Sequence, residues 1–141
     1  MQPLDLSIAP PRAPRAELAG VVFLPRSVDK VRAALPGGNL GAYTVPGFTQ
    51  MLIEGLGMSV ESFTEVVAAA PDDAAVAAFV LKNTTQAQRD EWNEFAFKRL
   101  PRGGDRAAAL QLYPWLSERA ELPLALDVLE EDDRRLFAQT G

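Results

Sequence analysis

Residues 21–38 read VVFLPRSVDKVRAALPGG, and this stretch decides how the rest of the chain is interpreted. The apolar run at its start leads through a proline into a segment with helical spacing of apolar side chains. A serine oxygen accepts a hydrogen bond from the free amides of a first helical turn, so we expect Ser27 to cap a helix over residues 28–35. The closing Pro-Gly-Gly is a strong helix stop. The stretch therefore predicts one short helix with well-defined ends.

The same pattern of helical segments between capping and helix-breaking residues recurs along the rest of the chain. Apolar side chains at helical spacing follow capping residues, and prolines or glycines end each run. A helix beginning at Phe48 is expected to end at Gly57, as a left-handed C-terminal cap. The expected N-terminal caps are Ser59, Asp72 or Asp73, Thr85, Asp105 and Asp127. The sequence therefore predicts an all-α fold, a single compact domain of about six to eight short helices held together by tertiary packing.

The N-terminal region has a different composition, because residues 1–15 contain four prolines. Proline lacks the amide donor and restrains the residue before it, which excludes a helix there. We expect an extended proline-rich arm over residues 1–15 and one α-helical domain over residues 16–141. A short helix is expected from Ala16 to Gly20, with VVFL either its end or a brief extended segment.

Composition bounds the class of protein. The chain has 141 residues, 48% of them hydrophobic, and a formal net charge of −5. These values are typical of soluble domains, and the negative charge disfavours a general nucleic-acid binder, whose surface would be basic. The N-terminus lacks the pattern of a secretory signal, and no apolar run approaches the roughly 18–20 residues that span a bilayer. We expect a cytoplasmic protein that does not bind membranes.

Two residue types are absent, cysteine and histidine. Their absence excludes disulfides, thiolate nucleophiles, thiolate metal sites and a histidine general base. Catalysis would have to rely on Asp, Glu, Lys, Arg, Tyr, Ser or Thr. We expect no cofactor and no resident metal, although a carboxylate-bound Mg²⁺ or Ca²⁺ stays open.

The predicted helix of the opening stretch carries Arg26, Asp29, Lys30 and Arg32. In a structural interpretation, Asp29 favours the positive helix start and pairs with Arg32 on a solvated surface. In a functional interpretation, the three cations surround a small anion such as a carboxylate or phosphate. The residues alone favour the structural interpretation.

Two further side chains are candidates for proton chemistry. Tyr43 lies in the glycine-rich stretch 37–47, which matches no phosphate-binding pattern and is more typical of a structural loop. Its phenol could still serve as a donor or an acid. Glu54 stands in an otherwise apolar helix, where burial would raise its pKa and suit it to acid–base work. The sequence does not tell whether Glu54 is buried.

The segment 90–95, DEWNEF, predicts core packing more than a ligand site. Trp92 shares an inward stripe with Phe95 and Ala96, whereas Asn93 faces another direction and is either functional or merely exposed. The acidic run 130–133 resembles a metal-binding cluster. Consecutive residues spread around a helix, so a solvated charged face is the favoured interpretation of that run.

The chain resembles the DUF5069 family, small bacterial proteins of unknown function. The resemblance lies in PPR at residues 10–12, ELAGVVFLPRSVDKVRAALPGG at 17–38 and GAY at 41–43, with Ala19 where a second glycine is expected. It runs through most of the chain and is strongest over residues 10–45. A family signature rich in charged residues and tyrosine implies a shared polar site, which makes the functional interpretation of the opening stretch as strong as the structural one.

Two functions remain open, and we favour the first. It is a metal-independent small-molecule-binding domain, or an acid–base enzyme such as a lyase, isomerase or cyclase. The alternative is an adaptor or regulatory protein, with Phe97, Trp115 and Phe137 in a partner or homodimer surface. In the first function an anionic ligand is bound by Arg26, Arg32, Trp92 and Asn93, and proton transfer falls to Asp29, Lys30, Tyr43 and Glu54.

Overall fold

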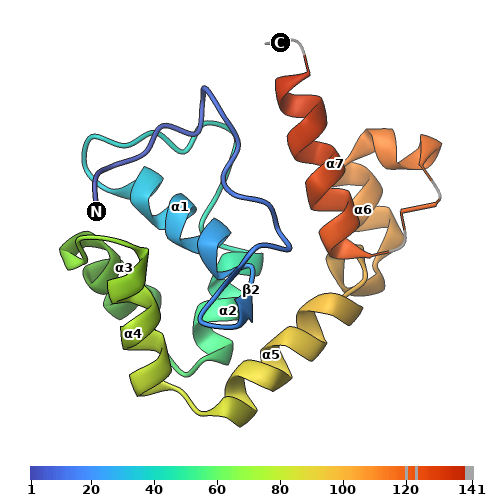
Figure 1. Ribbon diagram of the computed structural model, residues 1–141. Helices are drawn as coiled ribbons and strands as arrows, with labels where there is room; N and C mark the ends of the chain where they lie inside the picture. The colour runs from blue at the N-terminus through green and yellow to red at the C-terminus, as the bar shows by residue number, and fades with distance from the viewer. Residues whose placement is uncertain (120, 123, 139–141) are drawn as a thin grey trace. The chain divides into compact units, whose positions relative to one another are not determined.

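The computed structural model describes residues 1–119, 121–122 and 124–138. These residues form seven α-helices, two short 3₁₀-helices and one two-stranded sheet (Figure 1). The fold is therefore mostly α, as predicted, with a small sheet that the sequence did not indicate. The chain groups into two compact units, residues 1–93 and 94–141, which are described in turn.

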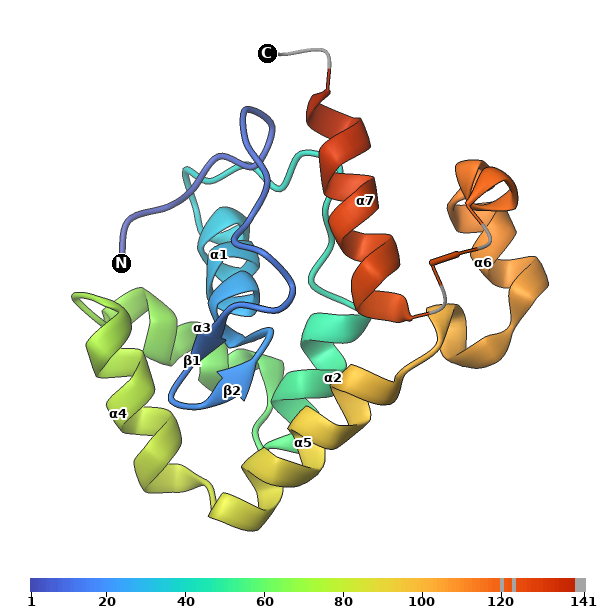
Figure 2. The same ribbon diagram turned by 45° about the vertical axis from the view of Figure 1, so that its right-hand side comes forward.

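In the first unit, α1 is the central helix. It packs against β1, α2 and α3, and α3 packs against α4 (Figures 1 and 2). The elements of this unit are β1 (Glu17–Leu18), β2 (Val21–Val22), α1 (Leu24–Ala34), α2 (Phe48–Gly55), α3 (Val60–Ala69), α4 (Asp73–Asn83) and the start of α5 (Gln86–Lys98).

The start of α1 differs from the prediction, and Ser27 is not its N-terminal cap. The helix begins at Leu24 after Phe23, which adopts a left-handed conformation with φ 74°. Pro25 lies in the first turn, where the missing amide hydrogen has no helical partner to lose. Ser27 is thus inside the helix and buried, with its hydroxyl 3.1 Å from that of Thr49. The predicted C-terminal end of the helix is confirmed, because α1 ends before the Pro-Gly-Gly sequence.

The predicted helix over residues 16–20 is wrong, because this segment forms a β-hairpin. Strands β1 and β2 pair antiparallel, with Leu18 opposite Val21. Ala19 and Gly20 form the turn with φ of 56° and 71°, the left-handed pair typical of a two-residue hairpin. Two-residue strands are too short to show alternation, which is why the sequence pattern missed them. The extended alternative for Val21–Val22 is confirmed.

The capping predictions for the later helices are confirmed except at Asp127, which lies inside the last helix (Ala125–Phe137) and accepts from the amide of Leu124. The side chain of Ser59 accepts a hydrogen bond from the amide of Ser62, and Asp72, not Asp73, caps α4. Thr85 accepts from the amide of Gln88 at 3.1 Å, in the predicted capping box. Gly57 follows α2 with the expected positive φ of 80°. Short-range capping chemistry therefore places these helix ends correctly.

The N-terminal segment is not confirmed as a separate extended arm. Residues 1–15 form no helix, as their prolines predict, but they belong to the first unit. The amide of Leu4 donates to the carbonyl of Arg32 at 3.3 Å, and the amide of Leu6 donates to that of Asn39 at 2.7 Å. Leu6 is buried. The segment is thus tied to the end of α1 and the residues that follow it.

The aromatic core of the first unit brings Phe23, Phe48 and Trp92 together. The ring centroids of Phe23 and Phe48 lie 4.5 Å apart, and those of Phe48 and Trp92 lie 5.4 Å apart in an edge-to-face arrangement. Trp92 and Ala96 are buried as predicted, but Phe95 is 41% exposed, so its inward assignment is wrong.

The second unit contains the end of α5 and four further elements. They are two 3₁₀-helices (Pro101–Gly104 and Pro114–Glu118), α6 (Arg106–Leu112) and α7 (Ala125–Phe137). Ala109, Leu116 and Val128 form its buried cluster, against which Tyr113 and Trp115 pack. No helix in the part of the chain that the structure describes is long and apolar enough to cross a membrane.

The acidic run at residues 130–133 is not a fully solvated face. Glu130 is exposed, but the Glu131 side chain is only 10% exposed and accepts hydrogen bonds from Arg119, Arg134 and Arg135. The hydrogen bond from Arg134 holds the pKa of Glu131 at about 2, below its ordinary value. Within residues 1–119, 121–122 and 124–138, no group of acidic side chains gathers in a way that could hold a metal ion.

Candidate ligand-binding site

Three of the four charged side chains singled out on α1 are buried. Arg26 is 1% exposed, Asp29 is 5% exposed and Lys30 is 7% exposed. A solvated surface is therefore the wrong interpretation of these three residues. Moving a charged side chain from water into a protein interior costs roughly several kcal/mol of free energy, unless hydrogen bonds or opposite charges compensate. Their surroundings must therefore supply that compensation.

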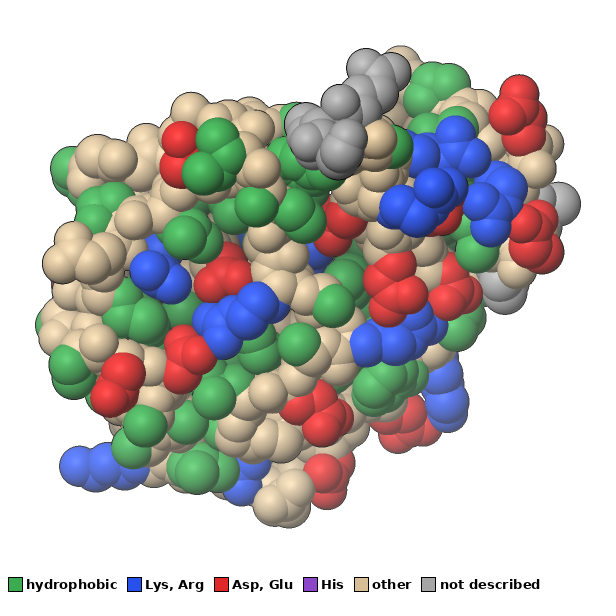
Figure 3. All heavy atoms as spheres, turned by 45° about the horizontal axis from the view of Figure 1, so that its top comes forward, with side chains coloured by type: hydrophobic (Ala, Val, Ile, Leu, Met, Phe, Trp, Pro, Cys, Tyr) green, Lys and Arg blue, Asp and Glu red, His purple; other side chains and the backbone are tan. Residues whose placement is uncertain are grey.

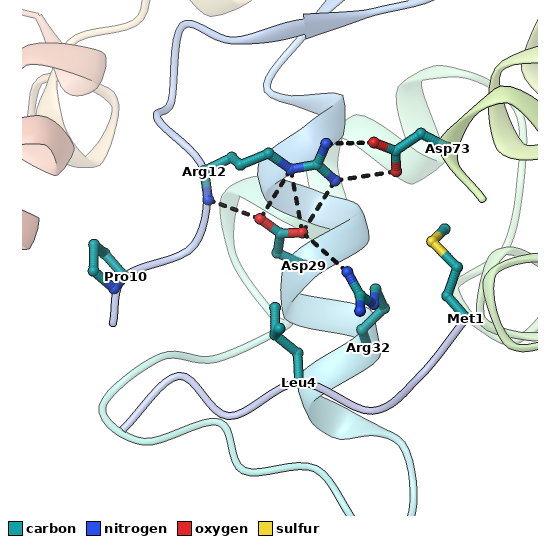
Figure 4. Close-up of a pocket in the computed structure, with 7 residues that line it drawn as sticks. All are labelled: Met1, Leu4, Pro10, Arg12, Asp29, Arg32 and Asp73. Atoms are coloured by element: carbon teal, nitrogen blue, oxygen red, sulfur yellow. Dashed lines mark hydrogen bonds and ion pairs between the residues drawn. The ribbon is translucent and has the colours of Figure 1, made fainter. Parts of the chain in front are cut away.

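The charged residues of α1 divide into two groups on different sides of the helix. Arg26 and Lys30 are four positions apart and lie by Phe23 and Tyr43. Asp29 and Arg32 are three positions apart and face the N-terminal segment and α4 (Figure 4). At about 100° per residue, Lys30 and Arg32 point roughly 160° apart. The helix therefore does not place these four side chains around one ligand.

The first group is a cation–aromatic cluster. The guanidinium carbon of Arg26 lies 5.7 Å from the ring centroid of Phe23 and 5.4 Å from that of Tyr43. The ammonium of Lys30 lies 5.7 Å and 5.8 Å from the same two centroids. Such contacts are attractive by about 2 kcal/mol when the cation is desolvated. Tyr43 is itself buried, so the cluster joins α1 to the loop that follows it.

The second group is an ion-pair clamp built around Arg12. The main-chain amide of Arg12 donates to Asp29 Oδ2 at 2.8 Å, and its Nη2 donates to Asp29 Oδ1 at 3.0 Å. The same guanidinium reaches Asp73, with Nη1 at 2.5 Å from Oδ2 and Nη2 at 3.2 Å from Oδ1 (Figure 4). Bidentate pairs of this kind are strong and geometrically specific. The Arg12–Asp29–Asp73 clamp therefore fixes the N-terminal segment, α1 and α4 to one another.

The clamp changes the electrostatics of its members. The hydrogen bond from Arg12 lowers the pKa of Asp73 below its ordinary value, and the charges of Arg12 and Arg32 lower it further. The hydrogen bond to Asp73 raises the pKa of Arg12. Asp73 is therefore ionised throughout the neutral range.

A pocket of about 500 Å³ lies beside the clamp. Its volume falls within the range of about 300–1,000 Å³ that is common for small-molecule sites. Figure 4 shows charged side chains from α1, α4 and the N-terminal segment around it, with apolar groups from the same segment. The lining residues are Met1, Leu4, Pro10, Arg12, Asp29, Arg32 and Asp73.

Arg32 lines this pocket and has hydrogen-bond donors that its neighbours do not use. Its Nε donates to the carbonyl of Gln2 at 2.8 Å, and its Nη1 lies 3.9 Å from Asp29 Oδ1, beyond hydrogen-bond distance. Among the residues that the structure describes, the two Nη groups of Arg32 donate no hydrogen bond. The Arg32 side chain is 22% exposed, so these groups are accessible from the pocket.

Six of the eight predicted site residues lie outside the pocket lining, three of them in the cation–aromatic cluster and three elsewhere, namely Glu54, Trp92 and Asn93. Glu54 is exposed and accepts a hydrogen bond from Gln50 at 2.9 Å, so the burial that would have suited it to acid–base work is absent. The indole of Trp92 donates to the carbonyl of Val22 at 2.9 Å. Asn93 accepts from the amide of Val22 at 3.0 Å and donates to the carbonyl of Gly20 at 2.8 Å. Trp92 and Asn93 thus hold the β-hairpin.

Two residues of the clamp, Arg12 and Asp73, are not among the site residues that the sequence predicts. Arg12 belongs to the PPR motif, which carries the family resemblance but suggests no role by itself. For Asp73 the sequence predicts only a capping role. Because one helix needs one cap, the second aspartate of Pro-Asp-Asp was available for another partner, and that was the signal in the sequence.

The fold and this site define a mostly helical domain with an ion-pair clamp, built on the buried Asp29, beside a pocket. Residues 8–135 match the family described as a domain of unknown function, DUF5069, so the chain belongs to the DUF5069 family. The match contains Arg12, Asp29, Arg32 and Asp73. No curated protein matches the chain.

Proposed function

We propose that this chain is a small-molecule-binding domain whose ligand carries an anionic group, and that the pocket beside the Arg12–Asp29–Asp73 clamp is its binding site. The observation that carries the proposal is the pair of unused Nη donors of Arg32, which face a pocket of about 500 Å³. A planar guanidinium with two free donor groups matches a carboxylate or phosphate.

The clamp supports binding by holding the pocket in one shape. Arg12 joins three chain segments through Asp29 and Asp73, so little side-chain freedom remains to be lost when a ligand binds. Preorganisation of this kind improves affinity because less ordering is needed on association. In this proposal Arg32 binds the anionic group, and Arg12 and Asp29 are positioning residues.

Binding without proton transfer is the better-supported form of this function. Both oxygens of Asp29 accept hydrogen bonds from Arg12, which leaves this carboxylate poorly suited to act as a base. Glu54 is exposed and lies outside the pocket. Acid–base chemistry at Lys30 or Tyr43 stays a prediction that belongs to the other side of α1.

An NMR titration tests the proposal. Butyrate and inorganic phosphate are added to ¹⁵N-labelled protein, and amide shifts are mapped onto the sequence. We expect shifts concentrated at residues 1–12 and in α1, and their loss in Arg32→Gln. Arg106→Gln is the matched control, because Arg106 is exposed in α6 of the second unit. Wild-type binding in Arg32→Gln, or no mapped shifts with either probe, would contradict the proposal.

The distribution of charge gives nucleic acid little support as a partner. On the face shown in Figure 3, basic and acidic side chains lie side by side, and no continuous basic field is seen. A phosphate-backbone binder concentrates cations on one face or along one helix. We therefore keep a small ligand as the proposed partner.

A protein–protein function has one observation in its favour. Phe97 is 39% exposed and Leu100 is 48% exposed near the end of α5. Trp115, also expected at such a surface, instead packs in the second unit, with the Arg135 guanidinium 4.7 Å from its ring centroid. A concentration-dependent mass in light scattering that Phe97→Ser abolishes would favour this function. A monomer mass that does not change with concentration would argue against this protein–protein function.

A further inference from the structure

We infer that the ligand is a zwitterion, an α-amino acid with an apolar side chain, whose carboxylate binds Arg32 and whose ammonium binds Asp73. The inference rests on the proposed function and names the class of ligand for the same pocket. It follows from the charges that line the pocket and from the hydrogen-bonding positions that they leave open.

The charged side chains that line the pocket balance in sign, and the α-ammonium of Met1, a further positive charge at the lining, donates to the carbonyls of Val67, Ala68 and Ala70. Arg12 and Arg32 supply two positive charges, and Asp29 and Asp73 supply two negative charges. The whole chain carries a net charge of −5, so a simple anion gains nothing from the long-range field of the protein. A zwitterion has no net charge and offers one group to each sign, which fits a pocket of this composition.

The hydrogen-bonding positions that remain open are of opposite kinds. Nε, Nη1 and Nη2 of Arg12 all donate within the clamp, and both oxygens of Asp29 accept from Arg12. Arg32 keeps free Nη donors. Each oxygen of Asp73 accepts one hydrogen bond from Arg12. Because a carboxylate has about four acceptor positions, Asp73 can also accept from an ammonium group.

Arg32 and Asp73 both line the pocket, from different elements. Arg32 comes from α1 and Asp73 from the first turn of α4, and Figure 4 shows Asp73 hydrogen-bonded to the Arg12 guanidinium and Arg32 beside Asp29. The described residues include no ion pair between the two side chains, and Arg32 still contributes to the lowered pKa of Asp73. A ligand with two opposite charges would join the two side chains through the pocket that both of them line. The Asp73 side chain is 36% exposed and is therefore accessible.

The rest of the lining predicts the side chain of the ligand. The side chains of Leu4, Pro10 and Met1 contribute apolar surface, and no further charged side chain lines the pocket in the part of the chain that the structure describes. Burial of an aliphatic side chain against this surface contributes roughly 25 cal/mol per Å² of apolar area. An amino acid such as leucine or alanine matches this lining better than a charged one.

Matched probes test the inference by isothermal titration calorimetry or NMR. L-leucine is compared with 4-methylpentanoate, which lacks the ammonium, and with 3-methylbutylamine, which lacks the carboxylate. L-alanine, propionate and ethylamine form a second set in case leucine is too large. In at least one set, we expect the amino acid to bind tenfold or more tightly than either single-charge analogue.

Two variants assign the two ends of the ligand. Asp73→Asn keeps an acceptor for Arg12 but loses the negative charge. The affinity for leucine should therefore fall to about the affinity for 4-methylpentanoate. The affinity for 4-methylpentanoate itself should stay unchanged or increase. Arg32→Gln should weaken both carboxylates. Asp72→Asn is the matched control, because Asp72 caps α4 outside the pocket lining and asparagine caps equally well. If Asp73→Asn does not fold, the affinities of the wild-type protein for the amino acid and its two single-charge analogues still test the inference.

The outcomes separate this inference from the proposed function. Equal affinity for the amino acid and the matching carboxylate overturns the zwitterion and leaves an anion site. Equal affinity for the amino acid and the matching amine also overturns it. Binding of none of these probes, with no binding of butyrate or phosphate, overturns both. Tenfold preference for the amino acid that Asp73→Asn removes, and Asp72→Asn does not, supports the inference.

Discussion

The two sides of α1 carry similar charged side chains in different surroundings. On one side, Arg26 and Lys30 lie by the rings of Phe23 and Tyr43. On the other, Asp29 and Arg32 adjoin the Arg12 clamp and a pocket. Burial of charge therefore does not by itself mark a ligand site. An open donor or acceptor beside a cavity is the sharper sign, and the clamp side combines the two at Arg32.

The largest expected effect is on the cation–aromatic side. Arg26→Ala removes a fully buried side chain, its contacts with two rings and its hydrogen bond to the carbonyl of Arg12. We expect a loss of about 3–5 kcal/mol in the free energy of unfolding, as for other buried charged groups. Urea denaturation followed by tryptophan fluorescence measures it. A loss below about 1 kcal/mol would mean that this side of α1 is not structural.

The clamp side should respond next. Arg12→Gln leaves Asp29 buried without its guanidinium, and we expect a loss of about 2–3 kcal/mol, the cost of an unsatisfied buried charge. Asp29→Asn in the same protein should restore part of the stability. A double-mutant cycle of the two changes measures their coupling, and additive effects would contradict a direct ion pair.

Acid should weaken the clamp through protonation of Asp73. Because the folded-state pKa of Asp73 is lowered, its contribution to stability is present above its ordinary pKa of 3.8 and is lost as the pH falls through the lower folded value. Asp73 is partly exposed, so the contribution is below about 1 kcal/mol. Unfolding free energies at pH 6 and pH 3 should fall less in Asp73→Asn than in the wild type. An equal fall in both proteins would show that Asp73 is not responsible.

The smallest effect is expected at Glu54, on neither side of α1. Its carboxylate is exposed and hydrogen-bonded only to Gln50 among the described residues. Glu54→Gln should change the free energy of unfolding by less than about 0.5 kcal/mol. It should also leave the titrations with leucine and butyrate unaltered. A change in either would return Glu54 to the list of candidate functional residues.

The sequence predicts helices well where the signal is local. Ser59, Asp72 and Thr85 cap helices because a side-chain oxygen and an amide three residues later meet in any chain that turns there. The hairpin at residues 17–22 was missed, since two-residue strands have no period to detect. The early start of α1 was missed because a proline in a first turn resembles an interruption.

The site could be predicted only in part. Asp29 and Arg32 were chosen from a local charge pattern, and the structure places both at the pocket. Arg12 and Asp73 lie 61 positions apart in the sequence, so their pairing depends on the tertiary fold. The separation of Lys30 from Arg32 follows from helical geometry and was available from the spacing alone.

The attachment of residues 1–15 has a consequence for the dynamics of the pocket. Leu4 and Leu6 are held to Arg32 and Asn39 by a few main-chain hydrogen bonds, and Leu4 lines the pocket. Local opening of residues 1–6 breaks these bonds and those of the Met1 ammonium to α3 and to Ala70, and it takes Leu4 away from the pocket, so it competes with ligand binding. A bound ligand should therefore slow hydrogen exchange at these two amides by a factor that grows with the ratio of ligand concentration to Kd, so the exchange rates measure binding.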